Sequence, residues 1–172
     1  MTHSPNYRDA NPLFRFMRTV GGTKPMSRYS ARTLHHVDRL IFRLTKGRTT
    51  MTSMTTGFPV VMLTTTGAKS GVARTLPLLG LPDGDRIAVI ASNYGQHDNP
   101  GWYYNLRKQP AATITVAGGT PRTVRAYEAE GDERERLWQK GLDVYPGWAG
   151  YERRATDRRI PVMVLEPEAS AD

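Results

Sequence analysis

The segment from residue 63 to residue 77, LTTTGAKSGVARTLP, places two glycines, a lysine, a serine and an arginine directly after an apolar run. Glycine allows positive φ angles and close approach of a ligand to backbone N–H groups, which favours anion binding. Lys69 and Arg74 add positive charge, and arginine binds phosphate through two parallel hydrogen bonds. The glycine spacing differs from that of the nucleotide-binding P-loop. The residues alone leave two interpretations open: an anion-binding loop, or a hairpin turn with two solvated basic side chains.

Two further segments combine aromatic and polar residues, NPGWYYNL at 99–106 and YPGWAGY at 145–151. At helical spacing, Trp102 and Leu106 make a core face, whereas Asn105 beside them needs a hydrogen-bond partner if it is buried. Aromatic side chains pack in cores and also stack on planar rings, so core packing and a cofactor wall are compatible interpretations.

Strand and helix patterns alternate unevenly along the chain. Strands are expected at 58–66, 73–82, 86–92, 112–116, 122–130 and 160–167, and helices at 101–109, 133–145 and 147–155. Asn99 is expected to cap the first of these helices, and Asp132 with Glu135 forms a capping-box pattern for the second. Short turns between strands and few helices predict an α+β fold around an antiparallel sheet or barrel rather than a doubly wound sheet.

The positive charge is confined to the first fifty residues. Residues 1–50 hold ten Lys or Arg and two Asp or Glu, and the remaining residues hold fourteen of each sign, which together give the net charge of +8. We therefore expect a basic helical leader at 1–50 and a neutral body at 51–172. A neutral body without a recognition motif argues against nucleic-acid binding.

Two leader helices are expected. The first begins at Pro12 after an Asn11 cap, and the second covers about residues 28–46. The second has Leu34, Val37, Leu40, Ile41 and Leu44 on one face and arginines on the other. This composition fits a helix that contacts an anionic membrane surface, but a five-residue apolar stripe is also what any helix packed on the body shows, and the latter interpretation is favoured.

The remaining composition narrows the cellular setting. There is no cysteine, which excludes disulfides and thiolate chemistry and fits a reducing cytoplasm. No apolar run approaches the roughly 20 residues that span a bilayer. The expected location is therefore cytoplasmic, with possible peripheral contact to the inner face of the plasma membrane. Adjacent His35 and His36 do not share a helix face, so no metal site is expected.

Three segments resemble the deazaflavin-dependent nitroreductase family, which belongs to the split β-barrel flavin and deazaflavin oxidoreductases of actinobacteria. They are LTTTGAKSGVARTLPLLGL, VIASNYGQHDNPGWYYNLRKQPAATI and YPGWAGYERRATDRRIPVMVLEP. The resemblance covers about residues 55–167. It implies an FMN-binding split-barrel-like fold and reduced coenzyme F420, an 8-hydroxy-5-deazaflavin, as the hydride donor.

The resemblance also implies site residues. The family's cofactor motif falls on Lys69, Ser70, Gly71, Arg74 and Pro77, and positions beside the deazaflavin fall on Ser92, Asn93, Trp102 and Asn105. Positions on the substrate side, where catalytic roles are expected, fall on Tyr145, Trp148, Tyr151 and again Ser92. Lys69 and Arg74 would hold the coenzyme's phosphate and acidic tail, which favours the anion-binding interpretation of the loop.

The implied reaction is hydride transfer to a small-molecule acceptor: a quinone, an activated enone or a nitro compound. Two residues depart from the family pattern. Ala68 stands at a position that is often basic, and Trp148 stands where the nitroreductase has tyrosine, which argues against nitro-drug activation. The alternatives are an FMN-binding split-barrel reductase and a non-catalytic deazaflavin-binding or membrane-binding protein. Related split barrels also make a homodimer an expectation.

Overall fold

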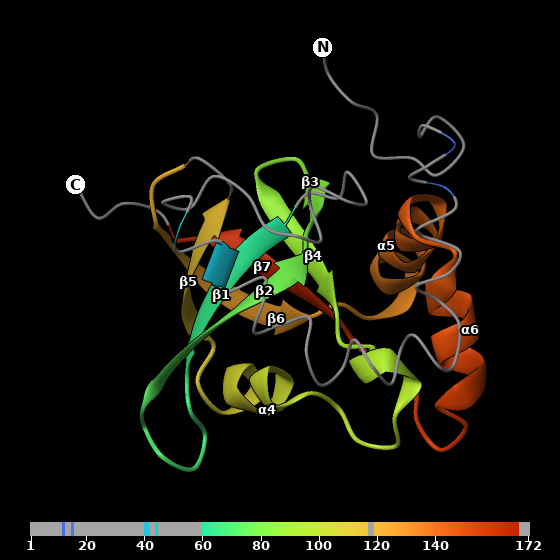
Figure 1. Ribbon diagram of the computed structural model, residues 1–172, viewed down its shortest axis with the longest axis horizontal. Helices are drawn as coiled ribbons and strands as arrows, with labels where there is room; N and C mark the ends of the chain where they lie inside the picture. The colour runs from blue at the N-terminus through green and yellow to red at the C-terminus, as the bar shows by residue number, and fades with distance from the viewer. Residues whose placement is uncertain are drawn as a thin grey trace.

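The computed structural model describes residues 60–116 and 119–168, together with five leader residues that are all helical: Pro12, Arg15, Leu40, Ile41 and Leu44 (Figure 1). The strands are β1 (Val60–Thr66), β2 (Ala73–Leu79), β3 (Leu81–Asp83), β4 (Arg86–Ile90), β5 (Ala111–Val116), β6 (Arg122–Glu128) and β7 (Val162–Pro167). The helical elements are the 3₁₀ turn η1 (Asn93–Gly95), α4 (Gly101–Lys108), α5 (Gly131–Val144) and α6 (Gly147–Arg154). The remainder of the expected leader helices lies outside the described residues.

The strands form one antiparallel sheet in the order β2-β1-β5-β6-β7-β4-β3. β2 and β3 stand at opposite ends of this order, yet only Gly80 separates them along the chain. The chain therefore closes the curled sheet into a barrel at this residue. A β-carbon on Gly80 would lie 3.1 Å from Ile87 and 3.3 Å from Val61. The prediction of a single strand at 73–82 is therefore wrong. The strand is interrupted at Gly80, where neighbouring side chains leave little room for a β-carbon.

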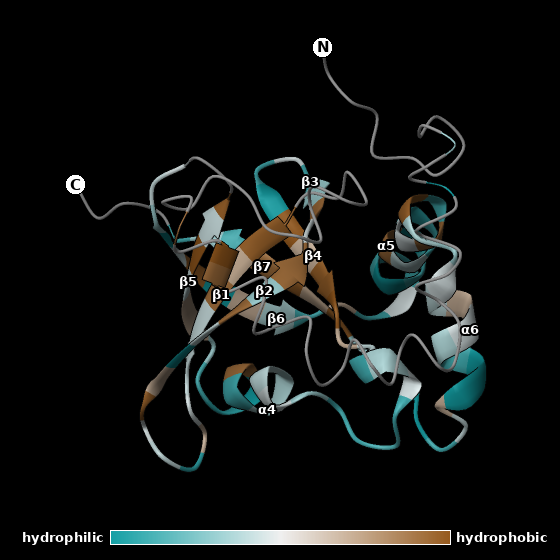
Figure 2. Ribbon diagram, in the orientation of Figure 1, coloured by the Kyte–Doolittle hydropathy of each residue, from teal (hydrophilic) through white to brown (hydrophobic). Residues whose placement is uncertain are grey.

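β4 and β7 are neighbours in the sheet and are buried on both faces. Along β7, Val162 and Val164 pack with α5 and α6, whereas Met163 and Leu165 point into the barrel with Trp102 and Leu106 of α4. β4 alternates in the same way. Strands covered on both faces read as continuous apolar runs, which explains IAVIA and VMVL in the sequence. Figure 2 shows these strands as the hydrophobic centre between more polar helices.

The helices cover two regions of the barrel. α4 lies across one end, in contact with β1 and β6 (Figure 1). α5 and α6 pack against each other, and α5 lies over β3, β4 and β7. A β-carbon on Gly141 of α5 would lie 2.6 Å from the Ile90 side chain, so this helix approaches β4 more closely than a larger residue permits. Among the described residues, no helix has the length and apolar character needed to cross a bilayer.

Both expected side-chain caps are wrong. The cap position of α4 is Pro100, and Asn99 instead accepts a hydrogen bond from Arg158 Nη1 at 2.6 Å. The cap position of α5 is Glu130, without a side-chain cap bond, and Glu135 Oε1 accepts from Gln139 at 2.8 Å. Asn99 is thus drawn to a partner after α6, whereas Glu135 bonds a neighbour one turn along its own helix.

The β3–β4 hairpin is fixed to α5 through Asp83. Its carboxylate accepts from Arg86 at 2.9 Å and from both Nη atoms of Arg136 at 2.7 and 3.0 Å, and Lys140 Nζ lies 3.7 Å away. The Asp83 side chain is only 11% exposed. The hydrogen bond from Arg136 is the main reason that the pKa of Asp83 falls from 3.8 to about 2. The charged form of Asp83 therefore stabilises the fold.

Replacement of Asp83 by Asn is expected to lower the free energy of unfolding at neutral pH by about 1–2 kcal/mol, after allowance for screening at the exposed basic partners. Because the pKa is lowered in the folded state, the stabilisation is present above the ordinary pKa and is lost as pH falls from about 4 to about 2. Urea unfolding of wild type and Asp83→Asn across this range measures the effect. Asp143→Asn, on the exposed side of α5, is the control. A constant difference between Asp83→Asn and wild type at all pH values would contradict the assignment.

Candidate active site

The β1–β2 loop is a compact turn that two glycines make possible. Gly67 N donates to Val72 O at 2.9 Å, and Gly71 N donates to Gly67 O at 2.8 Å. Gly71 has φ +67°, in the left-handed region that glycine adopts without steric cost. A β-carbon on Gly67 would lie 2.6 Å from Ser70 Oγ and 3.1 Å from Val72 O. The expected turn after β1 is confirmed, with both glycines in positions that require them.

Helix α4 holds this loop through Asn105 and Lys108. Asn105 Oδ1 accepts from Ala68 N at 2.8 Å, and its Nδ2 donates to Thr65 Oγ1 at 2.9 Å. Lys108 Nζ donates to Ala68 O at 2.6 Å. Asn105 and Thr65 are both buried. The partner that buried Asn105 was expected to need is therefore the loop backbone, and the structure gives Asn105 a positioning role.

The basic residues of the loop face solvent. Lys69, Ser70, Gly71 and Arg74 are all exposed, and Pro77 is half-buried in β2, opposite Met62 of β1. Within residues 60–116 and 119–168, neither Lys69 nor Arg74 makes a hydrogen bond or ion pair, although Asp and Glu residues pair with several other arginines. Two positive charges are thus held beside a fixed loop without a carboxylate to neutralise them. This arrangement is suited to an anionic ligand.

The second part of the candidate site is the turn that follows β4, which contains Ser92 and Asn93. Three successive residues, Asn93, Tyr94 and Gly95, have φ values of 45°, 56° and 75°. Gly95 N donates to Ser92 O at 2.8 Å, and Asn93 Nδ2 donates to Asp98 O at 2.8 Å. Non-glycine residues seldom adopt this region, and such conformations concentrate at functional sites.

The aromatic residues Tyr145, Trp148 and Tyr151 are all buried between α5, α6 and the sheet. The Tyr145 and Tyr151 hydroxyls lie 3.1 Å apart, and the Trp148 ring meets Tyr145 edge-on at 5.5 Å between centroids. Burial raises the pKa of Tyr145 and of Tyr151 above that of a free phenol. Both hydroxyls therefore stay protonated at neutral pH, and one of them donates a hydrogen bond to the other.

The fold brings some of these parts together and separates others. Tyr94 lies 6.0 Å from Tyr151 between ring centroids, so the turn after β4 and the aromatic cluster form one region. The β1–β2 loop lies at the C-terminal end of α4, and the turn after β4 lies beyond its N-terminal end (Figure 1). Trp102 of α4 is buried in the barrel core, which confirms the core-packing interpretation of that helix face.

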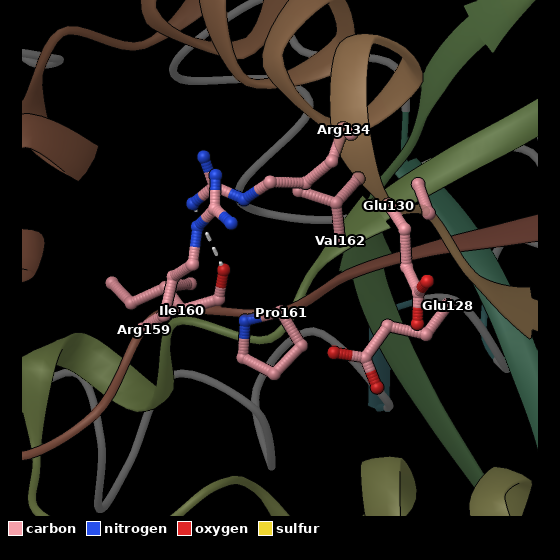
Figure 3. A pocket seen from close by; sticks show the side chains of 9 residues that line it. Glu128, Glu130, Arg134, Arg159, Ile160, Pro161 and Val162 are labelled. Atoms are coloured by element: carbon pink, nitrogen blue, oxygen red, sulfur yellow. Dashed lines mark hydrogen bonds between the residues drawn. The ribbon is translucent and has the colours of Figure 1, made fainter.

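A separate pocket of about 390 Å³ lies between the end of β6, the start of α5 and the segment before β7 (Figure 3). Its charged lining residues are Glu128, Glu130, Arg134 and Arg159. Buried Arg134 donates to Ile160 O at 3.2 Å and lies 3.4 Å from Glu135. Glu128 accepts from Arg107 at 2.7 Å. The lining thus holds two acidic and two basic side chains, whereas the β1–β2 loop carries two cations and no carboxylate.

Comparison with known proteins identifies the family. The model of the F420H(2)-dependent quinone reductase family matches residues 35–167. The chain belongs to this family. The match begins inside the second expected leader helix, so it extends beyond the barrel on the N-terminal side.

Relatives of this quinone reductase family member come from mycobacteria. Rv3178 of Mycobacterium tuberculosis, which carries a provisional name as an F420H(2)-dependent quinone reductase, is 39% identical over 63% of this chain and 90% of its own length. The F420H(2)-dependent quinone reductase Rv1261c of the same organism is 37% identical over 62% of this chain and 72% of its own length.

Two solved structures at 38% identity also match. An F420-H2 dependent reductase, FDR-A, has a TM-score of 0.56 over 63% of this chain and 94% of its own. A structure titled as a domain-swapped dimer has a TM-score of 0.57 over 63% of this chain and 80% of its own. The expected α+β split barrel and the F420-dependent oxidoreductase class of the family are thereby confirmed. Homodimerisation of this chain remains a prediction.

Sequence reasoning missed Arg158 and Arg154. Arg158 hydrogen-bonds Ser92 O at 2.9 Å, and Arg154 hydrogen-bonds Tyr94 O at 3.3 Å and lies 4.8 Å from the Tyr151 ring centroid. Both come from the segment ERRATDRR, whose charge density is typical of a solvated surface. No local pattern in this quinone reductase family member distinguishes the two arginines from their exposed neighbours.

Replacement of Asn105 by Leu is expected to lower the free energy of unfolding by about 2–3 kcal/mol, because the buried Thr65 hydroxyl and the Ala68 N–H lose their partner. The released loop should also be cleaved faster by trypsin after Lys69. Urea unfolding and limited proteolysis measure the two effects. Gln109→Leu, exposed just beyond the same helix, is the matched control. Unchanged cleavage together with reduced stability would show that Asn105 supports the core but not the loop.

Proposed function

We propose that this chain reduces quinones with F420H2, and that the β1–β2 loop binds the anionic portion of the coenzyme. The observation that carries the proposal is the pair of exposed cations, Lys69 and Arg74, beside a loop that α4 holds in place. Because α4 already holds the loop backbone, the loop loses less conformational entropy on binding an anion than a flexible loop would. Family membership supplies the identity of the coenzyme.

The residues fit the coenzyme's chemistry on the anionic side. A phosphate and an acidic tail need cations that no protein carboxylate already neutralises, and both loop cations meet this condition within the described barrel. Ala68 replaces a basic residue at this position, but its backbone N–H and carbonyl are what Asn105 and Lys108 hold. The departure therefore removes one charge and leaves the loop geometry intact.

Bound in its reduced form, F420 supplies a hydride, and a quinone that accepts it also takes up a proton to become a hydroquinone. The acceptor oxygen gains negative charge in this process. We propose that Ser92 and Asn93, on the turn after β4, lie beside this oxygen, with Tyr145 and Tyr151 behind them. Because the raised pKa of Tyr145 makes it a weak acid, its hydroxyl stabilises charge as a hydrogen-bond donor and the proton comes from solvent.

Trp148 favours quinone over nitro acceptors in this proposal. Its indole fills the space beside Tyr145 and is buried, where the nitroreductase pattern has a phenol. The substitution removes one hydroxyl from the acceptor region. After hydride transfer, a quinone carries its negative charge on one carbonyl oxygen. A nitro group spreads the charge over two adjacent oxygens and needs more hydrogen-bond donors close together.

Replacement of Lys69 or Arg74 by Ala is expected to raise the dissociation constant for F420 about tenfold each, since each loses a charge-assisted hydrogen bond to the coenzyme. Quenching of tryptophan fluorescence during titration with F420 measures the affinity, with FMN titrated in parallel. Arg125→Ala, which removes an exposed arginine of β6, is the matched control. If neither loop variant weakens F420 binding, the anion site lies elsewhere. Saturable FMN binding of equal strength would contradict the coenzyme assignment.

We further propose that the leader contacts an anionic membrane at the cytoplasmic face, where lipid-soluble quinones are available. Leu40 and Leu44 are helical, one turn apart, and 57% and 73% exposed. Exposed leucines at this spacing on a basic segment fit interfacial binding.

The double replacement Leu40→Gln with Leu44→Gln is expected to reduce co-sedimentation of the full-length chain with phosphatidylglycerol vesicles by about tenfold, because two apolar side chains leave the interface. Vesicles of phosphatidylcholine alone provide the control for charge. Equal sedimentation of wild type and variant would show that these leucines do not contact lipid.

A further inference from the structure

Three consecutive left-handed residues need an external restraint to persist. Tyr94 has a side chain that disfavours positive φ, whereas Asn93 tolerates it and Gly95 adopts it freely. A β-carbon on Gly95 would lie 2.7 Å from Tyr151 O, so even the glycine is fixed by contact with α6. Two backbone hydrogen bonds, Gly95 N to Ser92 O and Gln96 N to Asn93 O, span the turn, and further hydrogen bonds reach it from the Asn93 side chain and from Arg154.

Arg158 provides contacts on both sides of this turn. Its guanidinium donates four hydrogen bonds, with Nη2 to Ser92 O at 2.9 Å, Nη1 to Ala91 O at 3.4 Å and to Asn99 Oδ1 at 2.6 Å, and Nε to Gln96 O at 3.2 Å. The acceptors precede the turn, follow it and precede α4. One planar group thus fixes where the chain enters the turn, where it leaves, and how it continues into the helix.

The arginine is itself held in place. Arg158 N donates to Ala155 O at 3.2 Å, just after α6, and Pro161 O accepts from Ala91 N at 2.9 Å at the start of β7. The side chain is partly buried, and burial lowers its pKa. Among the described residues no carboxylate lies within ion-pair distance of the Arg158 guanidinium, so its charge is balanced by backbone carbonyls. These carbonyl groups must therefore remain oriented toward the Arg158 guanidinium.

From this geometry we propose that Arg158 is a positioning residue for catalysis: it fixes the orientation of the Ser92–Asn93 peptide in the acceptor region. The inference rests on the proposed function for its catalytic consequence, while its structural part stands independently. Arginine suits the role because its planar fork reaches several acceptors at once, whereas lysine is a point donor on a flexible stem. Displacing reactive groups by a fraction of a bond length lowers turnover strongly.

The test compares Arg158→Gln and Arg158→Lys in the full-length chain, with Arg153→Gln on the exposed side of α6 as the matched control. Amide hydrogen exchange measures the turn directly. In both Arg158 variants, exchange at Gly95 and Gln96 is expected to accelerate by about tenfold or more, while exchange in α5 stays at the wild-type rate. With F420H2 and menadione, turnover should fall about tenfold or more while the dissociation constant for F420, set by the β1–β2 loop, changes less than about twofold.

Asn99→Ala provides a milder second variant, because it removes only the Arg158 anchor at 2.6 Å and leaves the arginine in place. It should show the same two effects at smaller size. Unchanged exchange at Gly95 and Gln96 in all three variants would overturn the inference. A wild-type chain that binds F420 but does not reduce menadione would overturn the proposed acceptor class instead, and the exchange data would still decide the role of Arg158. Accelerated exchange with unchanged turnover would contradict the catalytic part.

Discussion

Burial of β4 and β7 on both faces is the constraint on which the rest of the structure depends. The central positions of both strands, 87–90 and 162–165, are all needed for packing, because one set of side chains fills the barrel and the other supports α5 and α6. Polar and charged groups that take part in binding therefore have to come from the segments that follow the strand ends. Such segments gain little from hydrophobic burial, so hydrogen bonds must hold them in place.

The two halves of the candidate site meet this requirement in different ways. At the β1–β2 loop, a buried neutral amide, Asn105, satisfies one backbone group of the loop and one hydroxyl of the adjoining strand. At the turn after β4, a cation, Arg158, satisfies several carbonyls at once. Lys108 also holds this loop, and its charge adds to the charges of Lys69 and Arg74 where we propose that an anion binds. The charged restraint adds positive potential behind Ser92, on the side where we propose that the acceptor oxygen lies.

The strands and helices of the barrel were predictable from the sequence because each depends on a local pattern. IAVIA and VMVL are apolar runs that predict buried strands. The glycines of the β1–β2 loop predict a turn, whatever element follows it. Predictions failed where contacts between residues distant in the sequence override the local pattern. Asn99 leaves its helix for Arg158, and the strand expected at 73–82 divides where Gly80 meets Ile87 and Val61 across the barrel. Contacts of this kind depend on tertiary packing, which cannot be inferred from a single sequence.

The candidate site shows the same division between chemistry and position. Lys69, Arg74 and the aromatic residues could be singled out in the sequence because their side-chain types suit binding, whereas Arg158 and Arg154 hydrogen-bond to backbone carbonyls. Seen as a sequence, ERRATDRR contains four arginines of equal appearance. In the fold, Arg153 and Arg159 are exposed, while Arg154 and Arg158 turn inward to carbonyls of the strained segment. The strained backbone at 93–95 identifies Arg154 and Arg158, since three left-handed residues in succession persist only where neighbouring groups hold them in that conformation.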